Sequence, residues 1–354
     1  MKVLLRVLII LAGILIAFFY INQPVKENAP LKAPNSNGKV IPQKVAPDLN
    51  NSVVERQNKG LSTLVGLSTK KLKKTLGTPD RKSPSAYDFD WWVYQKSPSN
   101  YLLIGVENNK VKQVYITGSE ADASPFKIGQ GIDELYRNTI TDTEVSVKIK
   151  QNIYTFILNE ADLQSRILIM YDGLYAQLYF DAIDKTLEAV RYIDGETLVK
   201  QHPYDMTYVG DLITPSVPSS YKQVEIDQEN RKQLFELTNV YRVQKGLPEL
   251  TSAEDLNELA MAHSEKLAVN NLSKEEQASD AFKDRLKIAE IQFDSAGENV
   301  TEDYLDAPEA INGLLNSEKH RDTLLNKHFN QIGTGAFGKH FTQVFIKRSE
   351  SDSH

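Results

Sequence analysis

Apolar and polar residues alternate along much of the chain between about residue 60 and residue 210. A period of two is typical of half-buried strands, and short helical stretches interrupt it. The first helix is expected over residues 68–76, with strands at 90–95, 101–107 and 110–117. The second helix is expected over residues 129–136, with strands at 145–149, 153–158, 166–171, 174–181 and 187–193. The pattern therefore predicts a β-rich domain of two helix-plus-meander repeats.

Two dipeptides in this region carry hairpin signals. Asn108-Asn109 and Asp172-Gly173 each separate two predicted strands. Both pairs favour the positive φ angles that a two-residue turn requires. We therefore expect antiparallel pairing across each of these dipeptides.

The hydrophobic period becomes helical in the last third of the chain. Residues 227–245 predict a helix with Asp227 as its N-cap and Gly246 as its stop. A second helix is expected after Ser252, with Asp255 completing a capping box. The strongly apolar runs 332–337 and 341–346 then predict a hairpin buried in a central sheet. These elements place the chain in the α+β class.

The amino-terminal segment has the pattern of a membrane anchor. Residues 7–21 are apolar and follow Lys2 and Arg6, and no small-residue cleavage site precedes Asn22. This favours an uncleaved single-pass anchor with an extracellular carboxy-terminal part, and secretion after cleavage is the alternative. Residues 22–58 are rich in Pro, Asn and Lys, which predicts a disordered linker.

Two prolines mark a further linker at residues 213–225. The expected organisation is an anchor or signal sequence at 1–21, a linker at 22–58, a β-rich domain at 59–212, a second linker at 213–225 and a C-terminal domain at 226–348. Because linkers imply few contacts across a boundary, we expect residues 226–348 to fold alone.

Composition narrows the functional classes. The formal net charge of −6 gives no basic footprint for nucleic acid, and the chain has no cysteine. Disulfides, thiolate metal sites, a thiol nucleophile and a lipoprotein anchor are thereby excluded.

Several short motifs occur jointly in the C-terminal domain. They are Asn239 and Arg242 on the first helix, Gly297-Glu298-Asn299-Val300, Ser317-Glu318-Lys319-His320-Arg321 and Ile332-Gly333-Thr334-Gly335. In this order they resemble the CAP superfamily (cysteine-rich secretory, antigen 5 and pathogenesis-related, or SCP-like, proteins) in its cysteine-free bacterial form. The preceding domain resembles the CAP-associated N-terminal domain of Gram-positive bacteria. The resemblance implies a three-layer α-β-α sandwich with a central cleft that holds four His and Glu residues.

Glu298 and His320 match two members of that cluster, and the other two have no match. Residues 272–275 read Leu-Ser-Lys-Glu where the family carries its first cluster histidine, and Leu314 stands where many bacterial relatives carry Trp. A catalytic zinc usually needs three protein ligands, so His263 or Glu275 would have to complete the site. Zinc therefore remains an alternative, and no cofactor is assigned.

The local pattern around these candidates suggests how they are held. We expect Glu298 in a turn, hydrogen-bonded to His320 across the cleft, and His320 neutral near the helix N-terminus at Ser317. His263 falls on the apolar face of its helix, where a histidine is more often a hydrogen-bonded core residue. Asn239, Arg242, Asn299 and Arg321 are assigned as a structural motif, with Asn239 and Arg242 fixing their helix to the following loop.

The favoured function is that of a membrane-tethered, non-enzymatic binding or interaction module at the cell envelope. Its ligand is a protein, a wall polymer or a lipid, and no catalytic residue is assigned. Ser264 and Ser317 adjoin histidines, but neighbouring residues on a helix point apart. The alternative is a divergent metal-dependent hydrolase that acts on a wall component or peptide through Glu298 and His320.

Cell fractionation tests the predicted anchor. We expect the full-length protein in the membrane fraction, where external protease digests it, because residues 7–21 lack a cleavage signal. Recovery of a mature form that begins near Pro24 in the medium would contradict anchoring.

Overall fold

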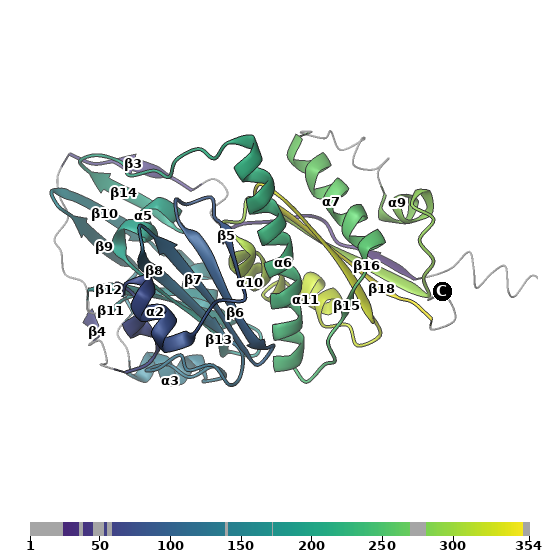
Figure 1. Cartoon of the computed structure of the whole chain (residues 1–354), viewed down its shortest axis with the longest axis horizontal. Coiled ribbons are helices and arrows are strands. Elements are labelled where there is room, and N and C mark those ends of the chain that lie inside the picture. The colour runs from purple at the N-terminus through teal and green to yellow at the C-terminus, as the bar shows by residue number, and fades with distance from the viewer. Residues whose placement is uncertain are drawn as a thin grey trace, which may run out of the picture.

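A computed structural model describes residues 24–34, 38–44, 53–54, 59–138, 141–171, 173–269 and 281–349. The predicted anchor, residues 1–21, lies outside these ranges. Within them, no helix has the length and apolar character needed to cross a membrane. The described chain forms three sheets, and the long helix α6 (Ser220–Gln244) stands between the two N-terminal sheets and the C-terminal sheet (Figure 1).

The β-rich part contains the strands that alternation predicts. The first repeat comprises helix α2 (Thr69–Leu76) and strands β5 (Arg81–Pro84), β6 (Asp90–Ser97), β7 (Asn100–Glu107) and β8 (Lys110–Thr117). The second comprises α3 (Ile132–Asn138), β9 (Glu144–Ile149), β10 (Asn152–Ile157), β11 (Arg166–Tyr171), β12 (Leu174–Asp181) and β13 (Thr186–Ile193). Additional elements are η1 (Leu61–Leu64), α4 (Glu160–Ser165), α5 (Gly195–Gln201) and β14 (Asp205–Val209).

The two meanders share one sheet instead of forming separate units. The eight strands run in the order β4-β11-β12-β13-β8-β7-β6-β5, where β4 is Val53–Val54, so β13 joins the second meander to the first through β8. Strands β9 and β10 lie outside this sheet and form a four-stranded sheet in the order β3-β14-β10-β9, where β3 is Val40–Pro42. The hairpin at Asn108-Asn109 is confirmed, with φ angles of 50° and 60° that match a type I′ turn.

The C-terminal domain is the expected three-layer sandwich. Its sheet contains β16 (Ser295–Glu302), β18 (His340–Lys347), β17 (Gln331–Phe337) and β15 (Thr251–Ser252) in that order. Helices α7 (Glu254–Val269) and α9 (Phe282–Ile288) cover one face, while α6, α10 (Ala307–Leu315) and α11 (Glu318–Leu324) cover the other. Alternate residues of β18 divide accordingly, with Val344 and Ile346 facing α7 and Phe341 and Phe345 facing α6 and α10.

Two glycines allow α7 to lie directly against β17. A Cβ atom at Gly333 would come within 2.1 Å of the Leu256 carbonyl carbon, and one at Gly335 within 2.3 Å of the Ala260 carbonyl carbon. The motif Ile332-Gly333-Thr334-Gly335 therefore serves close helix-to-sheet packing.

The start of α6 differs from the prediction. Its N-cap is Ser219, whose hydroxyl accepts a hydrogen bond from the Lys222 backbone, so the predicted linker 213–225 is helical from residue 220. Asp227 is not a cap, because the helix has already begun, and its carboxylate accepts from the Gly338 backbone instead. The residues before Asp227 carry no apolar stripe, and for this reason the pattern missed them.

The described parts of residues 22–58 include four short strands, whereas the sequence analysis predicted a disordered linker. Strands β1 (Val25–Glu27) and β2 (Leu31–Lys32) pair in parallel with β16, β3 (Val40–Pro42) pairs with β14, and β4 (Val53–Val54) pairs with β11. Edge strands offer unpaired backbone groups that can bond to any extended segment. Such pairing does not need hydrophobic periodicity, so the polar sequence of residues 22–58 did not indicate these strands.

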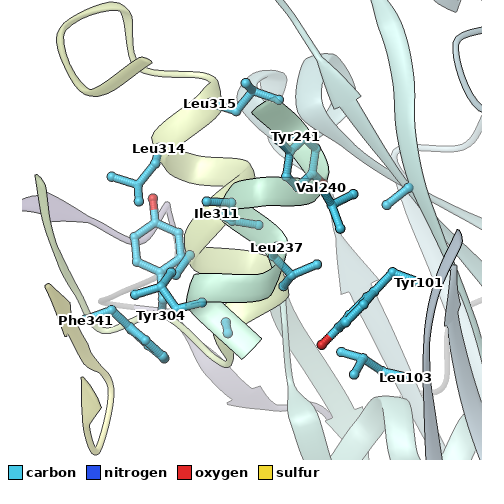
Figure 2. Packing of buried hydrophobic residues seen from close by; sticks show 14 of the residues in the cluster. Tyr101, Leu103, Leu237, Val240, Tyr241, Tyr304, Ile311, Leu314, Leu315 and Phe341 are labelled. Atoms are coloured by element: carbon cyan, nitrogen blue, oxygen red, sulfur yellow. The ribbon is translucent and has the colours of Figure 1, made fainter. Parts of the chain in front are cut away.

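The two domains share a hydrophobic core. Tyr101 and Leu103 of β7 pack toward Leu237, Val240 and Tyr241 of α6 in one buried cluster (Figure 2). On its far side α6 packs against Ile311, Leu314 and Leu315 of α10 (Figure 2). Helix α6 is therefore an internal layer covered by both domains.

Buried charges also cross the boundary. Arg166 of β11 binds Glu309 of α10 at 2.6 Å, and Arg191 of β13 binds Asp306 at 2.8 Å. Arg81 of β5 donates hydrogen bonds to Glu229 and Glu236 of α6. Burial disfavours the Glu309 carboxylate, but Arg166 and Arg191 outweigh it and lower the pKa of Glu309 below its ordinary value. These contacts contradict the premise that few interactions join the domains.

Removing one partner of such a pair should destabilise the whole chain. We expect Arg166→Met to reduce the free energy of unfolding by about 3–5 kcal/mol, because the buried carboxylates of Glu309 and Asp162 lose the guanidinium that binds them directly. Denaturant unfolding of the full chain measures this loss. The control is Arg348→Met, which breaks the partly exposed pair with Asp255 and should cost about 0–1 kcal/mol. Equal losses in the two variants would show that the buried pair has no special weight.

Candidate functional site

The sequence pattern predicted a turn at Glu298, but the residue lies in the middle of a strand. It occupies β16, where its backbone pairs with β1 on one side and β18 on the other, and its side chain is 1% exposed. The run Gly297-Glu298-Asn299 lacks β-branched residues, which is why the pattern suggested a turn. Backbone pairing on both sides outweighs that weak local preference.

The Glu298 carboxylate is held by a guanidinium. Arg285 of α9 donates one hydrogen bond to each carboxylate oxygen, at 2.8 Å and 2.7 Å. His263 of α7 lies beside this pair, with its Nε2 4.0 Å from the nearer Glu298 oxygen. His263 and Arg285 also line a small cleft of about 230 Å³ between α7 and α9. The bidentate geometry makes Arg285 the main neutralising partner of Glu298.

His320 belongs to a different hydrogen-bond network. Its Nδ1 lies 2.8 Å from the Ser317 hydroxyl and its Nε2 lies 3.0 Å from the Ala29 carbonyl. A carbonyl oxygen can only accept, so Nε2 carries a proton, and in the neutral ring Nδ1 accepts from the Ser317 hydroxyl. Burial lowers the pKa of His320, and the nearby charges of Lys26 and Lys319 act in the same direction. His320 is thus the neutral histidine that the sequence analysis expected.

Glu298 and His320 do not face each other across one cleft. Successive side chains of a strand point to opposite faces. Glu298 points toward α7 and α9, whereas Asn299 points toward α11 and donates to the His320 backbone carbonyl at 3.0 Å. The predicted hydrogen bond between Glu298 and His320 is therefore wrong, because the sheet lies between the two side chains.

Among the described residues, the donor set does not suit a zinc ion. Arg285 occupies both oxygens of Glu298, and His320 is turned to the other face of the sheet. Within the described ranges, no group of three or more His, Cys, Asp or Glu residues is placed to hold a metal. Glu275, the other ligand considered, lies outside those ranges. We therefore assign no metal-dependent step to these residues.

Asn239 and Arg242 tie α6 to the loop after it. Asn239 exchanges hydrogen bonds with the backbone of Leu250 at 3.0 Å and 2.8 Å. Arg242 donates to the carbonyls of Pro248 and Leu324. The two residues thus have the structural arrangement expected from their spacing.

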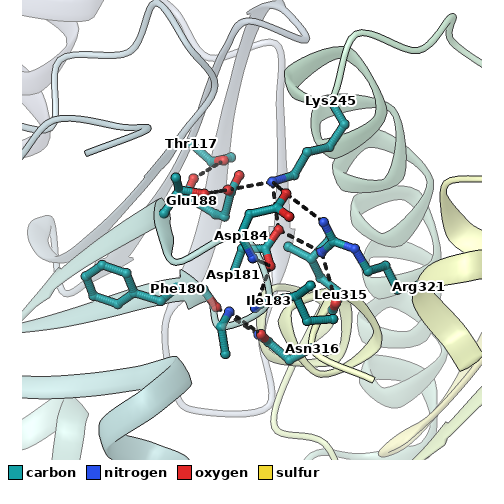
Figure 3. Close-up of polar contacts among 12 residues, drawn as sticks. Thr117, Phe180, Asp181, Ile183, Asp184, Glu188, Lys245, Leu315, Asn316 and Arg321 are labelled. Carbon is teal, nitrogen blue, oxygen red and sulfur yellow. Dashed lines mark hydrogen bonds and ion pairs between the residues drawn. The ribbon is translucent and has the colours of Figure 1, made fainter. Parts of the chain in front are cut away.

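Arg321 binds the other domain. Its guanidinium contacts Asp181 and Asp184, both at 2.7 Å, and Lys245, the residue directly after α6, binds the same two carboxylates (Figure 3). Asn316 extends the contact by donating to the Phe180 carbonyl at 2.8 Å (Figure 3). Arg321 and Lys245 therefore clamp the β12–β13 turn of the N-terminal domain to the C-terminal domain.

Sequence reasoning missed Arg285 and Lys245. Both lie among other charged residues, and nothing in their spacing separates a buried cation from a solvated one. No helix was predicted around Arg285, so its approach to Glu298 had no signal.

Comparison with known proteins is consistent with this two-domain arrangement. A family model described as CAP-associated N-terminal matches residues 65–204, and one described as the cysteine-rich secretory protein family matches residues 235–344. A Bacillus subtilis (strain 168) protein named "Uncharacterized membrane protein YlbC" is 40% identical over 290 residues, which is 82% of this chain and 84% of that protein. The chain belongs to the CAP family. Residues 65–204 match its associated N-terminal domain, and the C-terminal sandwich contains the CAP domain.

Two crystal structures share the fold of both domains. An extracellular protein containing a SCP domain from Bacillus anthracis str. Ames is 32% identical, with a TM-score of 0.77 over 86% of this chain and 100% of that chain. A cysteine-rich secretory protein from Staphylococcus aureus subsp. aureus Mu50 is 26% identical, with a TM-score of 0.75 over 92% of this chain and 100% of that chain. The CAP domain thus occurs together with its associated domain in these proteins.

The pair of Arg285 and Glu298 should be sensitive to loss of one charge. We expect Arg285→Met to reduce the free energy of unfolding by about 3–5 kcal/mol, because it leaves a buried carboxylate without its guanidinium. In the double variant Arg285→Met/Glu298→Met most of this loss should return, since the buried carboxylate is removed together with its guanidinium. Denaturant unfolding of parent, single and double variants measures the coupling. A double variant as unstable as the single one would show that the ion pair is not the cause.

Proposed function

We propose that this protein is a membrane-tethered, extracytoplasmic CAP-domain protein that acts as a non-enzymatic binding or interaction module of the cell envelope. The observation that carries the proposal is the bidentate pair of Arg285 and Glu298. A carboxylate bound in this way is a poor base and a poor metal ligand, because both of its oxygens already accept charge-assisted hydrogen bonds. His320 is similarly engaged, with both ring nitrogens in hydrogen bonds.

The location rests on the sequence and on the names of relatives. Residues 7–21 have the pattern of an anchor, one relative is named a membrane protein, and a structural relative is described as extracellular. These observations agree with an envelope protein whose folded part lies outside the cell.

A surface suited to binding lies between the two domains. A cleft of about 510 Å³ is lined by residues of both, including Arg166 and His202 from the N-terminal domain and Tyr304 and Lys339 from the CAP domain. Its volume falls within the range of about 300–1,000 Å³ that is usual for ligand sites. Because buried ion pairs and a shared core fix the domains to each other, this cleft has a defined shape.

Zinc titration combined with a wall-binding assay separates binding from hydrolysis. The detergent-solubilised full chain would be titrated with zinc chloride in a calorimeter and incubated with dye-labelled cell envelopes. We expect zinc affinity weaker than micromolar and retention of the protein on envelopes without release of soluble dye, because Arg285 competes for Glu298.

The matched variant for this assay is Glu298→Gln. It removes the negative charge of Glu298, which would be a metal ligand only in the alternative hydrolase. Micromolar or tighter zinc binding, together with zinc-dependent dye release that Glu298→Gln abolishes, would overturn the proposal in favour of the hydrolase. Absence of retention on envelopes would contradict the binding role directly.

A further inference from the structure

Residues 24–33, which we call the N-terminal strap, cover the edge of the CAP sheet. Strand β1 aligns Val25 with Ala296 and Glu27 with Glu298, and β2 continues the pairing further along β16. Backbone hydrogen bonds at 3.0 Å and 2.9 Å close the two ends, from Ala296 to Pro24 and from Ala33 to Glu302. The strap is thus an added parallel strand that blocks the outer edge of β16.

Asn28 is the one buried residue of the strap, at 5% exposure. Its side-chain amide lies within 3.3 Å of four acceptors: the Asn299 and Thr323 side chains at 2.9 Å and 3.0 Å, and the Glu298 and Lys319 carbonyls at 3.3 Å. All four belong to β16 or α11. We call this set of acceptors the asparagine slot, because an amide donor fits it and an apolar side chain would remove the donor that Asn28 supplies to the Asn299 and Thr323 side-chain oxygens.

The strap also contacts the partners of both cleft candidates. Glu27 lies 3.8 Å from Arg285, which holds Glu298, and accepts a hydrogen bond from the Phe282 backbone at 3.1 Å. On the other face of the sheet, the Ala29 carbonyl accepts from His320. The strap therefore extends from α9 to α11 across the sheet edge, and it covers polar groups that would otherwise be open to a ligand.

The remaining strap residues are weakly packed. Lys26, Glu27, Ala29, Pro30 and Lys32 are exposed, and Val25 and Leu31 are only partly buried. A segment with few buried apolar contacts opens at low free-energy cost compared with the core. The strap is bound to β16 by backbone pairing, which any extended peptide can supply, and by the Asn28 side chain, which requires an asparagine at that position.

We propose that the edge of β16 and the asparagine slot form a peptide-binding groove, and that the strap is its intramolecular occupant. The partner is an extended polypeptide that pairs in parallel with β16 and places an asparagine in the slot, a case of recognition by strand addition. This proposal rests on the binding role inferred above and names the class of partner for it. In the intact chain the strap competes through its high effective concentration, so the groove binds a partner only when the strap lifts.

A labelled peptide with the sequence of residues 24–33 tests the groove in the full chain. Fluorescence anisotropy should show binding to the Asn28→Ala chain at least tenfold tighter than to the parent, because the weakened strap no longer competes. A peptide with alanine in place of its asparagine should bind the same variant about tenfold more weakly. Lys32→Ala, which changes an exposed strap residue outside the slot, should behave as the parent does.

A unique thiol gives an independent measurement, since the chain has no cysteine. Thr323 is fully buried under Asn28, so Thr323→Cys should react slowly with a maleimide, about tenfold faster when combined with Asn28→Ala, and slowly again after addition of the peptide. Failure of the peptide to bind the Asn28→Ala chain, or equal binding with and without its asparagine, would overturn the proposal. Retention of the same variants on cell envelopes is measured separately. If the peptide test fails but the variants are still retained on envelopes, the groove is rejected and the proposed binding role stands.

Discussion

A buried carboxylate needs a cation, and in this protein the cation often comes from a distant part of the chain. Glu309 belongs to the CAP domain, yet its oxygens are bound by Arg166, Gln177 and Tyr179 of the associated domain. Transfer of an unpaired ion from water to the interior is far more costly than any single apolar contact is favourable. The position of α10 is therefore fixed by chemistry that neither domain completes alone, and α6 lies between the same two surfaces.

The same principle governs the candidate site. Glu298 is as buried as Glu309 and is satisfied by a guanidinium from the short helix α9. On the opposite face, Asn299 and His320 are joined through backbone carbonyls and not through charge. The sheet thus separates an ionic network from a neutral one, although their central residues are neighbours in sequence. This separation explains how a His and a Glu from the family motif can both be present without acting on a common atom.

Much of the fold could be predicted from local signals. Alternation located the strands from β6 to β13, and the two apolar runs near the C-terminus located the hairpin of β17 and β18. The failures share a physical cause, which is that they depend on partners far away in sequence. β16 is a strand because β1 and β18 bond to both of its edges, and residues 24–33 are extended because β16 offers a free edge. Arg285 is buried, and Lys245 is partly buried, only because another element approaches each of them. A one-dimensional pattern carries no trace of that approach.

The position of the strap sets the reach of the CAP domain. If residues 7–21 lie in the membrane, as their pattern predicts, only residues 22–24 separate Ile21 from Val25, the first residue of the sheet. The four steps along the chain from Ile21 to Val25 span at most about 14 Å, whereas a free linker of residues 22–58 would extend on the order of 100 Å. An anchored chain would therefore hold the edge of the CAP sheet next to the bilayer surface. The sheet edge could then contact molecules next to the lipid headgroups, but it could not reach molecules in the outer layers of the wall.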